Sequence, residues 1–293
     1  MERILAALDG SAESEQILDQ AVRFAGRNAA IDLLHVVPTF NHAIPGVGFN
    51  VEDLAAIYLD RVAERLSGRK VRTFVWRGAP EEEIPKAARS LNADLLALTT
   101  HGRRGLSHLL MGSVAEVVVR NSPVPVLMIR PGLPVPERPV ERILVPFDGS
   151  EASGDVFEPV RTLAADHGAE ILLLQVRTPL VADLTPLGFP LSSSDPGPTL
   201  EEQVRRLQAK GLRVSPVVAQ GDPAAQILRQ ARNLQVDLIA MATVGRKGLS
   251  RILLGSVAEE VVRKMDRPVV LHRVTPSSEA LRRAQEQHAP GSD

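Results

Sequence analysis

The stretch GRRGLSHLLMGSVAEVVVR occupies residues 102–120, and GRKGLSRILLGSVAEEVVR occupies residues 245–263. Fourteen of the nineteen aligned positions are identical, far more than the composition of the chain would give by chance. A second pair of segments supports the same repeat, because ERILAALDGS begins at Glu2 and ERILVPFDGS begins at Glu141. The offset is 139 residues for the second pair and 143 for the first. The chain therefore contains one unit twice, with only small insertions between the copies.

The length of the repeat indicates a whole domain in each copy. A period of about 140 residues is too long for a solenoid, and 293 residues with 44% hydrophobic content suit two domains of ordinary size. We expect module 1 over residues 1–131 and module 2 over residues 140–276. The connector PGLPVPERPV at 131–140 carries four prolines, which block regular structure and stiffen it.

Composition restricts the possible partners. The formal charge is -1, from 34 basic and 35 acidic residues, so no global field attracts nucleic acid or an anionic membrane surface. The chain has no cysteine, which excludes disulfides, thiol nucleophiles and thiolate metal sites and is compatible with a reducing compartment. The opening MERILAALDG is too short for a signal-peptide core or a membrane span. We expect a cytoplasmic protein with neither nucleic acid nor membrane as a partner.

Short apolar runs alternate with segments of helical periodicity. In module 1 we expect strands over 3–8, 31–37, 71–78, 93–100 and 124–130, and helices over 11–25, 51–66, 81–91 and 113–120. Pro85 predicts a late start or a kink in the third helix. Module 2 repeats this order, with its middle helix shortened to residues 200–210. Continuously apolar strands separated by helices are typical of a parallel sheet buried on both faces, so we predict an α/β fold of two tandem five-stranded modules.

In such sheets ligands bind outside the carboxyl ends of the strands. The first strand of each module ends in Asp-Gly-Ser, at Asp9 and at Asp148. This tripeptide can simply turn the chain and cap the next helix. Its recurrence at the same edge of both sheets favours a second role, in which the carboxylate accepts a hydrogen bond from a sugar hydroxyl or a base amine.

The repeated stretch follows the fourth strand of each module. Gly112-Ser113 and Gly255-Ser256 each open a helix, where free N–H groups and the helix dipole favour an anion. Arg103 and Arg104 lie nearby in module 1, and Arg246 and Lys247 in module 2. The alternative is structural, with glycines that only turn the chain. There is no P-loop, GxGxxG dinucleotide fingerprint, HExxH or GxSxG motif, and the histidines lack metal-ligand spacing.

These motifs together resemble the universal stress protein family. They are LDGS or FDGS after the first strand, HV after the second, HGRRGL, and GSVAE before a PV-type strand. The resemblance covers nearly the whole chain and implies a Rossmann-like fold of the adenine nucleotide alpha hydrolase type. In nucleotide-binding members the loop reads G-x-x-G, nine residues, G-[S/T]. Gly102 with Gly112-Ser113, and Gly245 with Gly255-Ser256, match its second and third parts. Thr99 and Ala242 replace its first glycine, and Ala7 replaces the family proline that Pro146 matches.

The resemblance also implies roles for individual residues. Asp9 and Asp148 would contact the ribose or adenine, and Val36 and Val176 would hold the adenine through their backbone. The phosphate loops would consist of Thr99, Gly102, Arg103, Gly112, Ser113 and Val114 in module 1, and of Ala242, Gly245, Arg246, Gly255, Ser256 and Val257 in module 2. The expected ligand is ATP, with Mg brought by the triphosphate.

The residues leave three functions open. The first is an ATP-binding regulator of the stress response with at most slow hydrolysis, because no general base is evident. The second is an interaction scaffold that has lost its nucleotide, and the third is a phosphotransferase or a nucleotide hydrolase such as a slow ATP hydrolase. In single-module relatives identical subunits pair through the last strand, so residues 124–131 and 267–274 are expected to pair within this chain as an intramolecular pseudo-dimer. The alternatives are a tail over each edge or pairing between chains, and a further homodimer of the whole chain is left open.

Overall fold

The computed structural model describes residues 1–26, 28–39, 50–100, 111–154, 156–178, 198–244 and 254–274. The elements of module 1 are β1 (Arg3–Leu8), α1 (Ala12–Glu15), α2 (Ile17–Phe24), β2 (Ala30–Val37), α3 (Val51–Glu64), β3 (Lys70–Arg77), α4 (Pro80–Ser90), β4 (Leu95–Thr99), α5 (Ser113–Asn121) and β5 (Val126–Ile129). Those of module 2 are β6 (Arg142–Pro146), α6 (Glu151–Gly154), α7 (Phe157–His167), β7 (Glu170–Arg177), α8 (Leu200–Ala209), β8 (Val214–Gln220), α9 (Pro223–Asn233), β9 (Leu238–Val244), α10 (Ser256–Lys264) and β10 (Val269–Val274).

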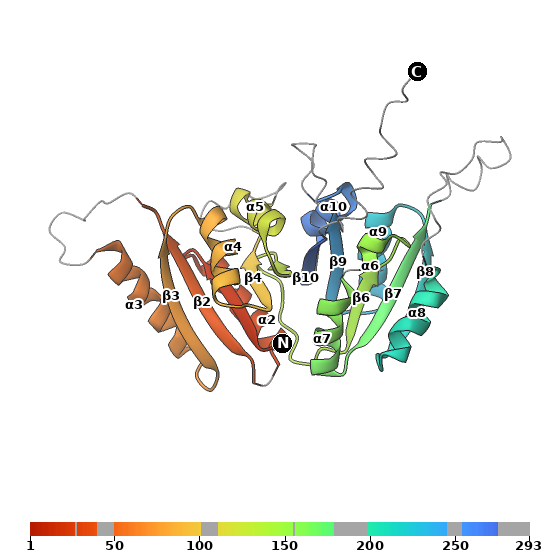
Figure 1. The fold of residues 1–293 in the computed structure, drawn as a ribbon, viewed down its shortest axis with the longest axis horizontal. Coiled ribbons are helices and arrows are strands. Elements are labelled where there is room, and N and C mark those ends of the chain that lie inside the picture. Colours follow the sequence, from red (N-terminus) through yellow and green to blue (C-terminus); the bar gives the residue numbers. More distant parts are fainter. Residues whose placement is uncertain are drawn as a thin grey trace, which may run out of the picture.

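The described strands form one ten-stranded sheet in the order β3-β2-β1-β4-β5-β10-β9-β6-β7-β8. Pairs within a module are parallel. The join between the modules is the antiparallel pair of β5 and β10, centred on Leu127 and Val270. Figure 1 shows β3 and β8 at opposite ends of the molecule. The predicted α/β architecture is confirmed, and the edge strands of both modules are paired with each other.

Helices cover both faces of this sheet. Helices α2, α3, α7 and α8 pack their buried apolar residues on one face, and α4, α5, α9 and α10 on the other. Successive strand residues point to opposite faces, so Leu33 belongs to one core and Leu34 to the other. This double burial explains why the strands read as continuous apolar runs in the sequence.

Two predicted helices differ from the structure. The helix expected over residues 11–25 is divided into α1 and α2 at Gln16, and the Ser11 side chain caps the start of α1 by accepting from Ser14 N–H. The late start predicted from Pro85 is wrong, since α4 begins at Pro80. Proline suits a first helical position because its missing N–H would have no partner there. Pro85 is buried further along the same helix.

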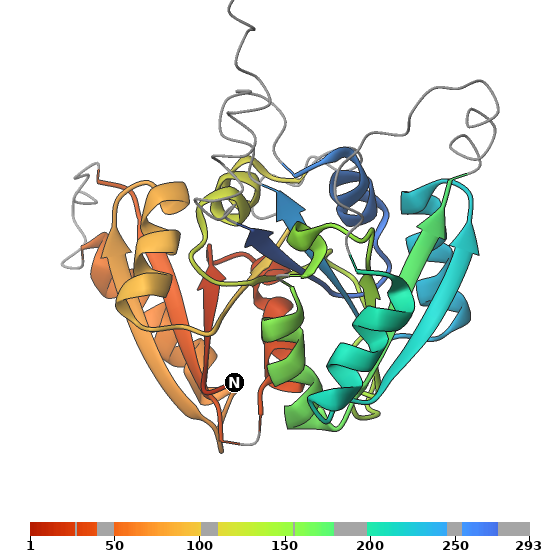
Figure 2. The same cartoon turned by 45° about the vertical axis from the view of Figure 1, so that its right-hand side comes forward.

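The modules also contact each other through α2 and α7, which lie on the same face of the sheet. Figure 2 shows α2 of module 1 beside α7 of module 2, where a ring nitrogen of His167 lies 3.1 Å from the carbonyl oxygen of Phe24. Close by, the buried Asp237 carboxylate accepts from Arg23 at 2.5 Å and from Arg138 of the connector at 3.0 Å. One side chain of module 2 is thus held by module 1 and by the connector.

Candidate functional site

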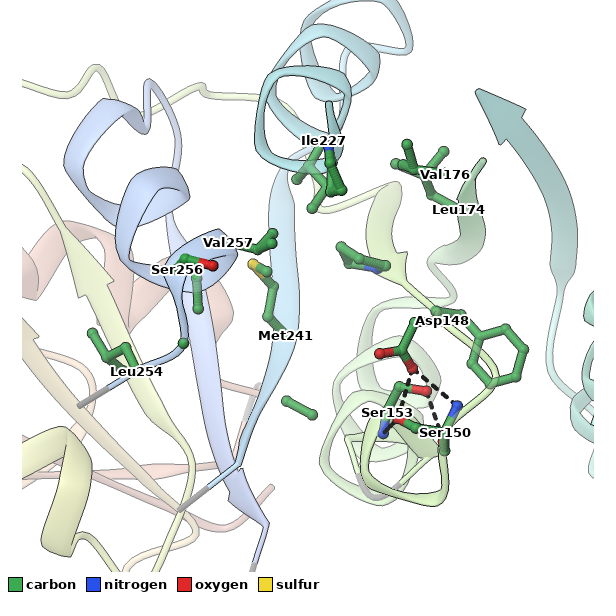
Figure 3. A pocket seen from close by; sticks show the side chains of 16 residues that line it. Asp148, Ser150, Ser153, Leu174, Val176, Ile227, Met241, Leu254, Ser256 and Val257 are labelled. Atoms are coloured by element: carbon green, nitrogen blue, oxygen red, sulfur yellow. Dashed lines mark hydrogen bonds between the residues drawn. The ribbon is translucent and has the colours of Figure 1, made fainter. Parts of the chain in front are cut away.

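A cavity of about 560 Å³ lies at the carboxyl ends of β6, β7 and β9, beside the start of α10 (Figure 3). Its walls are mostly apolar and come from Pro146, Phe147, Leu174, Val176, Pro223, Ile227, Met241, Ala242, Leu254, Val257 and Ala258. Asp148, Ser150, Ser153, Gly255 and Ser256 add polar groups. A cavity of this size and character suits a small ligand with an apolar part and a polar part.

The cavity brings together most of the residues predicted for module 2. Six of them line it, namely Asp148, Val176, Ala242, Gly255, Ser256 and Val257. They come from the ends of three strands and from the first turn of α10, which meet because the strands are parallel. Gly245 and Arg246, with Gly102 and Arg103 of module 1, lie outside the described residues. Ligand contact by any of these residues stays a prediction.

The Asp-Gly-Ser segments form the same turn in both modules. Asp9 Oδ1 accepts from the Ser11 amide at 3.0 Å and from its hydroxyl at 2.5 Å. Asp148 Oδ1 accepts from the Ser150 amide at 2.9 Å and from its hydroxyl at 2.6 Å. Each serine in turn accepts from the amide three residues later, at Ser14 or Ser153. The turn and the cap are therefore present in both modules, and a ligand role for the two aspartates stays a prediction.

The turn also stabilises the charged form of the Asp148 side chain. Partial withdrawal of the carboxyl from water favours the protonated form, but the hydrogen bonds from Ser150 and Ser153 outweigh it and lower the pKa of Asp148. The residue is exposed at the rim of the cavity. Asp148 is consequently an anionic hydrogen-bond acceptor at neutral pH, and Figure 3 shows it beside both serines.

The two helix-opening glycines differ in conformation. Gly112 has φ -57°, and its N–H donates to the Thr100 carbonyl oxygen at 2.8 Å. A Cβ built on Gly112 would lie 3.0 Å from that oxygen. Gly255 has φ 79°, and a Cβ built there would meet no described atom within 4 Å. Ser113 and Ser256, the next residues, are both exposed.

The remaining predicted residues of module 1 lie at the ends of its strands. Val36 is buried near the end of β2, Thr99 is buried as the last residue of β4, and Val114 is half-buried in the first turn of α5. Together with Asp9 and Gly112 they occupy one edge of the sheet.

Sequence reasoning missed the apolar wall of the cavity. Pro223 and Ile227 belong to α9, and Met241 points to the same face of β9 as Ile239. The repeat carried a signal for two of them, because Pro80 and Ile84 stand at the matching places in module 1. Apolar residues on helices and strands are normally core, so nothing else in their pattern indicated a ligand.

The described part of the chain has neither a metal-ligand cluster nor a membrane-spanning helix. It contains no group of three or more histidine, aspartate or glutamate side chains arranged to hold a metal ion. None of its helices combines the length and the apolar character that crossing a bilayer requires.

Known proteins resemble the chain over both modules. The model of the universal stress protein family matches residues 1–130 and again residues 139–273. A universal stress protein of Mycobacterium tuberculosis strain H37Rv is 28% identical over 310 aligned residues, covering 92% of this chain and 95% of that protein. One of Methanocaldococcus jannaschii is 30% identical over 142 residues, covering 45% of this chain and 81% of that protein.

A solved structure supports the fold. The crystal structure of a universal stress protein from Archaeoglobus fulgidus has a TM-score of 0.68 at 21% identity, covering 92% of this chain and 98% of that one. The two family matches leave only the connector and the last residues unmatched. The chain therefore belongs to the universal stress protein family.

Proposed function

We propose that this chain is a nucleotide-dependent regulator of the stress response that binds ATP at the carboxyl edge of its sheet. The observation that carries the proposal is the cavity of about 560 Å³, in which apolar walls meet an anionic acceptor and the start of a helix. Its volume is within the range of about 300 to 1,000 Å³ that is usual for small-molecule sites.

Each part of the cavity suits a part of the ligand. Leu174, Val176 and Ile227 offer an apolar surface to a flat base. The Asp148 carboxylate can accept from ribose hydroxyls, and charged acceptors make stronger hydrogen bonds than neutral ones. The free amides and dipole at the start of α10 favour a phosphate near Ser256. Magnesium binds readily through substrate phosphates without a protein cage, so ATP would bring its own ion.

The cavity lining favours a binding role over rapid catalysis. Its described residues include one carboxylate, Asp148, and no histidine, lysine or arginine. Asp148 already accepts two hydrogen bonds from Ser150 and is stabilised in its charged form, which makes it a weak general base. We propose that nucleotide occupancy is the signal and that hydrolysis is at most slow.

Calorimetric titration with ATP and Mg²⁺ tests this proposal. We expect a dissociation constant in the micromolar range, which corresponds to roughly -8 kcal/mol. Mass spectrometry of the freshly purified protein should also detect an adenine nucleotide. The absence of heat with ATP at millimolar concentration, and of any copurified nucleotide, would contradict the proposal.

A scaffold without nucleotide is the second candidate. It is favoured by Thr99 and Ala242, which stand where nucleotide-binding relatives carry a glycine at the end of the fourth strand. The same titration decides between the two functions, because a scaffold gives no heat with ATP.

We also propose that the chain acts as a pseudo-dimer of its modules. The antiparallel pairing of β5 with β10 supports this, because it covers the edge through which single-module relatives would pair. Sedimentation equilibrium should then give the mass of one chain, 31.7 kDa. A dimer that persists at nanomolar concentration would indicate a further interface.

A further inference from the structure

We infer that each chain binds one nucleotide, in module 2, because the main chain of module 1 closes the equivalent position. This inference rests on the proposed function and concerns which of its two predicted sites is used. Matched positions in the two modules differ in four ways.

The first difference is a proline at the end of β6. The ladder between β1 and β4 extends to Ala6↔Ala97, whereas that between β6 and β9 ends at Leu144↔Ile239, one rung earlier. Phe147 N–H donates to the carbonyl oxygen of Leu174 in β7. Because backbone groups alternate between the two neighbouring strands, the backbone of residue 146 faces β9 on the other side of β6. Pro146 has no N–H to donate there, whereas Ala7 does. The end of β6 is therefore released from β9 where β1 remains paired.

The second difference is on the other side of the same strand. The ladder between β1 and β2 extends to Leu8↔His35, but that between β6 and β7 ends at Pro146↔Leu174. In a parallel ladder the additional rung joins the N–H of Val36 to the C=O of Leu8. Val176 follows Leu174 by two residues, so its backbone N–H and C=O point to the same side as those of Leu174, toward β6. They lie beyond the last rung of the β6–β7 ladder. Its backbone groups thus face the cavity that Val176 lines.

The third difference concerns the amide at the start of the last helix. Gly112 N–H is used within module 1, by the Thr100 carbonyl at 2.8 Å. Among the described residues, no such bond joins Gly255 to Thr243, the equivalent of Thr100. Gly255 is exposed and lies in the left-handed region, with φ 79°. The Gly255 amide therefore has no partner among the described residues, whereas the Gly112 amide is bonded within its own module.

The fourth difference is the side chain at the end of the fourth strand. Thr99 is 8% exposed at the end of β4, whereas Ala242 is half-buried at the matching place in β9 and lines the cavity. Threonine is bulkier than alanine by a hydroxyl and a methyl group. The first three differences leave more of the backbone unpaired in module 2 than in module 1, and the fourth leaves more room there.

Calorimetric titration of the full chain with ATP and Mg²⁺ tests the inference. The matched variants are Ser256→Trp and Ser113→Trp, at exposed positions that tolerate a large side chain without disturbing the core. The second pair is Gly255→Val and Gly112→Val, with folding checked by circular dichroism. We expect one site per wild-type chain. Both module 2 variants should weaken binding at least about tenfold, or about 1.4 kcal/mol, and both module 1 variants should change it less than about twofold.

The outcomes separate this inference from the proposed function. Two sites per chain, or loss of binding in Ser113→Trp, would overturn the inference and leave the proposed function standing. Equal weakening by both variants of a pair would overturn it as well. No binding to the wild-type chain would overturn the proposed function, and the inference with it.

Discussion

The two modules share their order of elements and fourteen of the nineteen residues in the repeated stretch, yet the carboxyl ends of their strands pair differently. Around β1 the ladders extend one rung further than around β6 on both sides. Few substitutions accompany this change, and Ala7 against Pro146 is the most direct. The comparison teaches that a duplicated site can diverge through backbone pairing while its motif stays nearly intact.

A second contrast is found at the amino ends of the strands. Asp94 and Asp237 occupy matching places before the fourth strand of each module. Asp94 is exposed and accepts from the amides of Glu2 and Arg3. Asp237 accepts from the equivalent amides of module 2, and also from Arg23 and Arg138. The aspartate at this place holds the start of the first strand in both modules, and in module 2 it also joins the two modules.

The largest predicted effect follows from that contrast. Asp237→Ala leaves the buried guanidinium of Arg23 without its partner, and we expect it to lower the free energy of unfolding by about 3 to 5 kcal/mol. Asp94→Ala removes hydrogen bonds at the surface and should cost only about 1 kcal/mol. Urea unfolding at pH 7 measures both. Equal losses in the two variants would show that the intermodule contact contributes little.

A smaller effect is expected at the cavity. Asp148→Asn keeps an oxygen that can accept from Ser150, so the turn is preserved while the charge is removed. We expect ATP affinity to fall about tenfold, or about 1.4 kcal/mol. The matched variant Asp9→Asn makes the same change in module 1. Should it weaken binding as much as Asp148→Asn does, both modules contribute to the site.

The smallest effect concerns acid. Burial favours protonation of Asp237, but the amides of Glu141 and Arg142 and the guanidinium of Arg23 outweigh it and lower its pKa. A lowered carboxyl pKa stabilises the fold above the unfolded value of about 3.9, and the contribution is lost as pH falls below it. The stability difference between wild type and Asp237→Asn should therefore shrink below about pH 4. Urea titrations from pH 7 to 3 measure it, and a constant difference would contradict the assignment.

Much of the fold was predictable because the strands between the outer pair, β3 and β8, are buried on both faces. The strand predicted over residues 3–8 has the same limits as β1. The last strands of the two modules pair with each other, as expected for strands that would otherwise be exposed sheet edges. The division of the first helix was harder to predict, because the apolar spacing continues across Gln16.

The site was predictable only in part. Motifs identified the polar residues of the cavity, such as Asp148 and Ser256, but its apolar wall looks like ordinary core. The Asp237 cluster joins positions 23, 138 and 237, and no periodic pattern relates residues so far apart in the chain. A repeated aspartate before the fourth strand was the available signal, since ADLLAL and VDLIAM both carry it.

The central claim is that module 2 offers an open backbone edge and module 1 a closed one. A crystal structure of the full chain grown with ATP and Mg²⁺ tests it most directly. We predict nucleotide density between Asp148, Val176 and Ser256, with Gly112 N–H still bonded to Thr100. Density beside Gly112, or an edge of module 2 that stays empty while ATP binds elsewhere, would contradict the account.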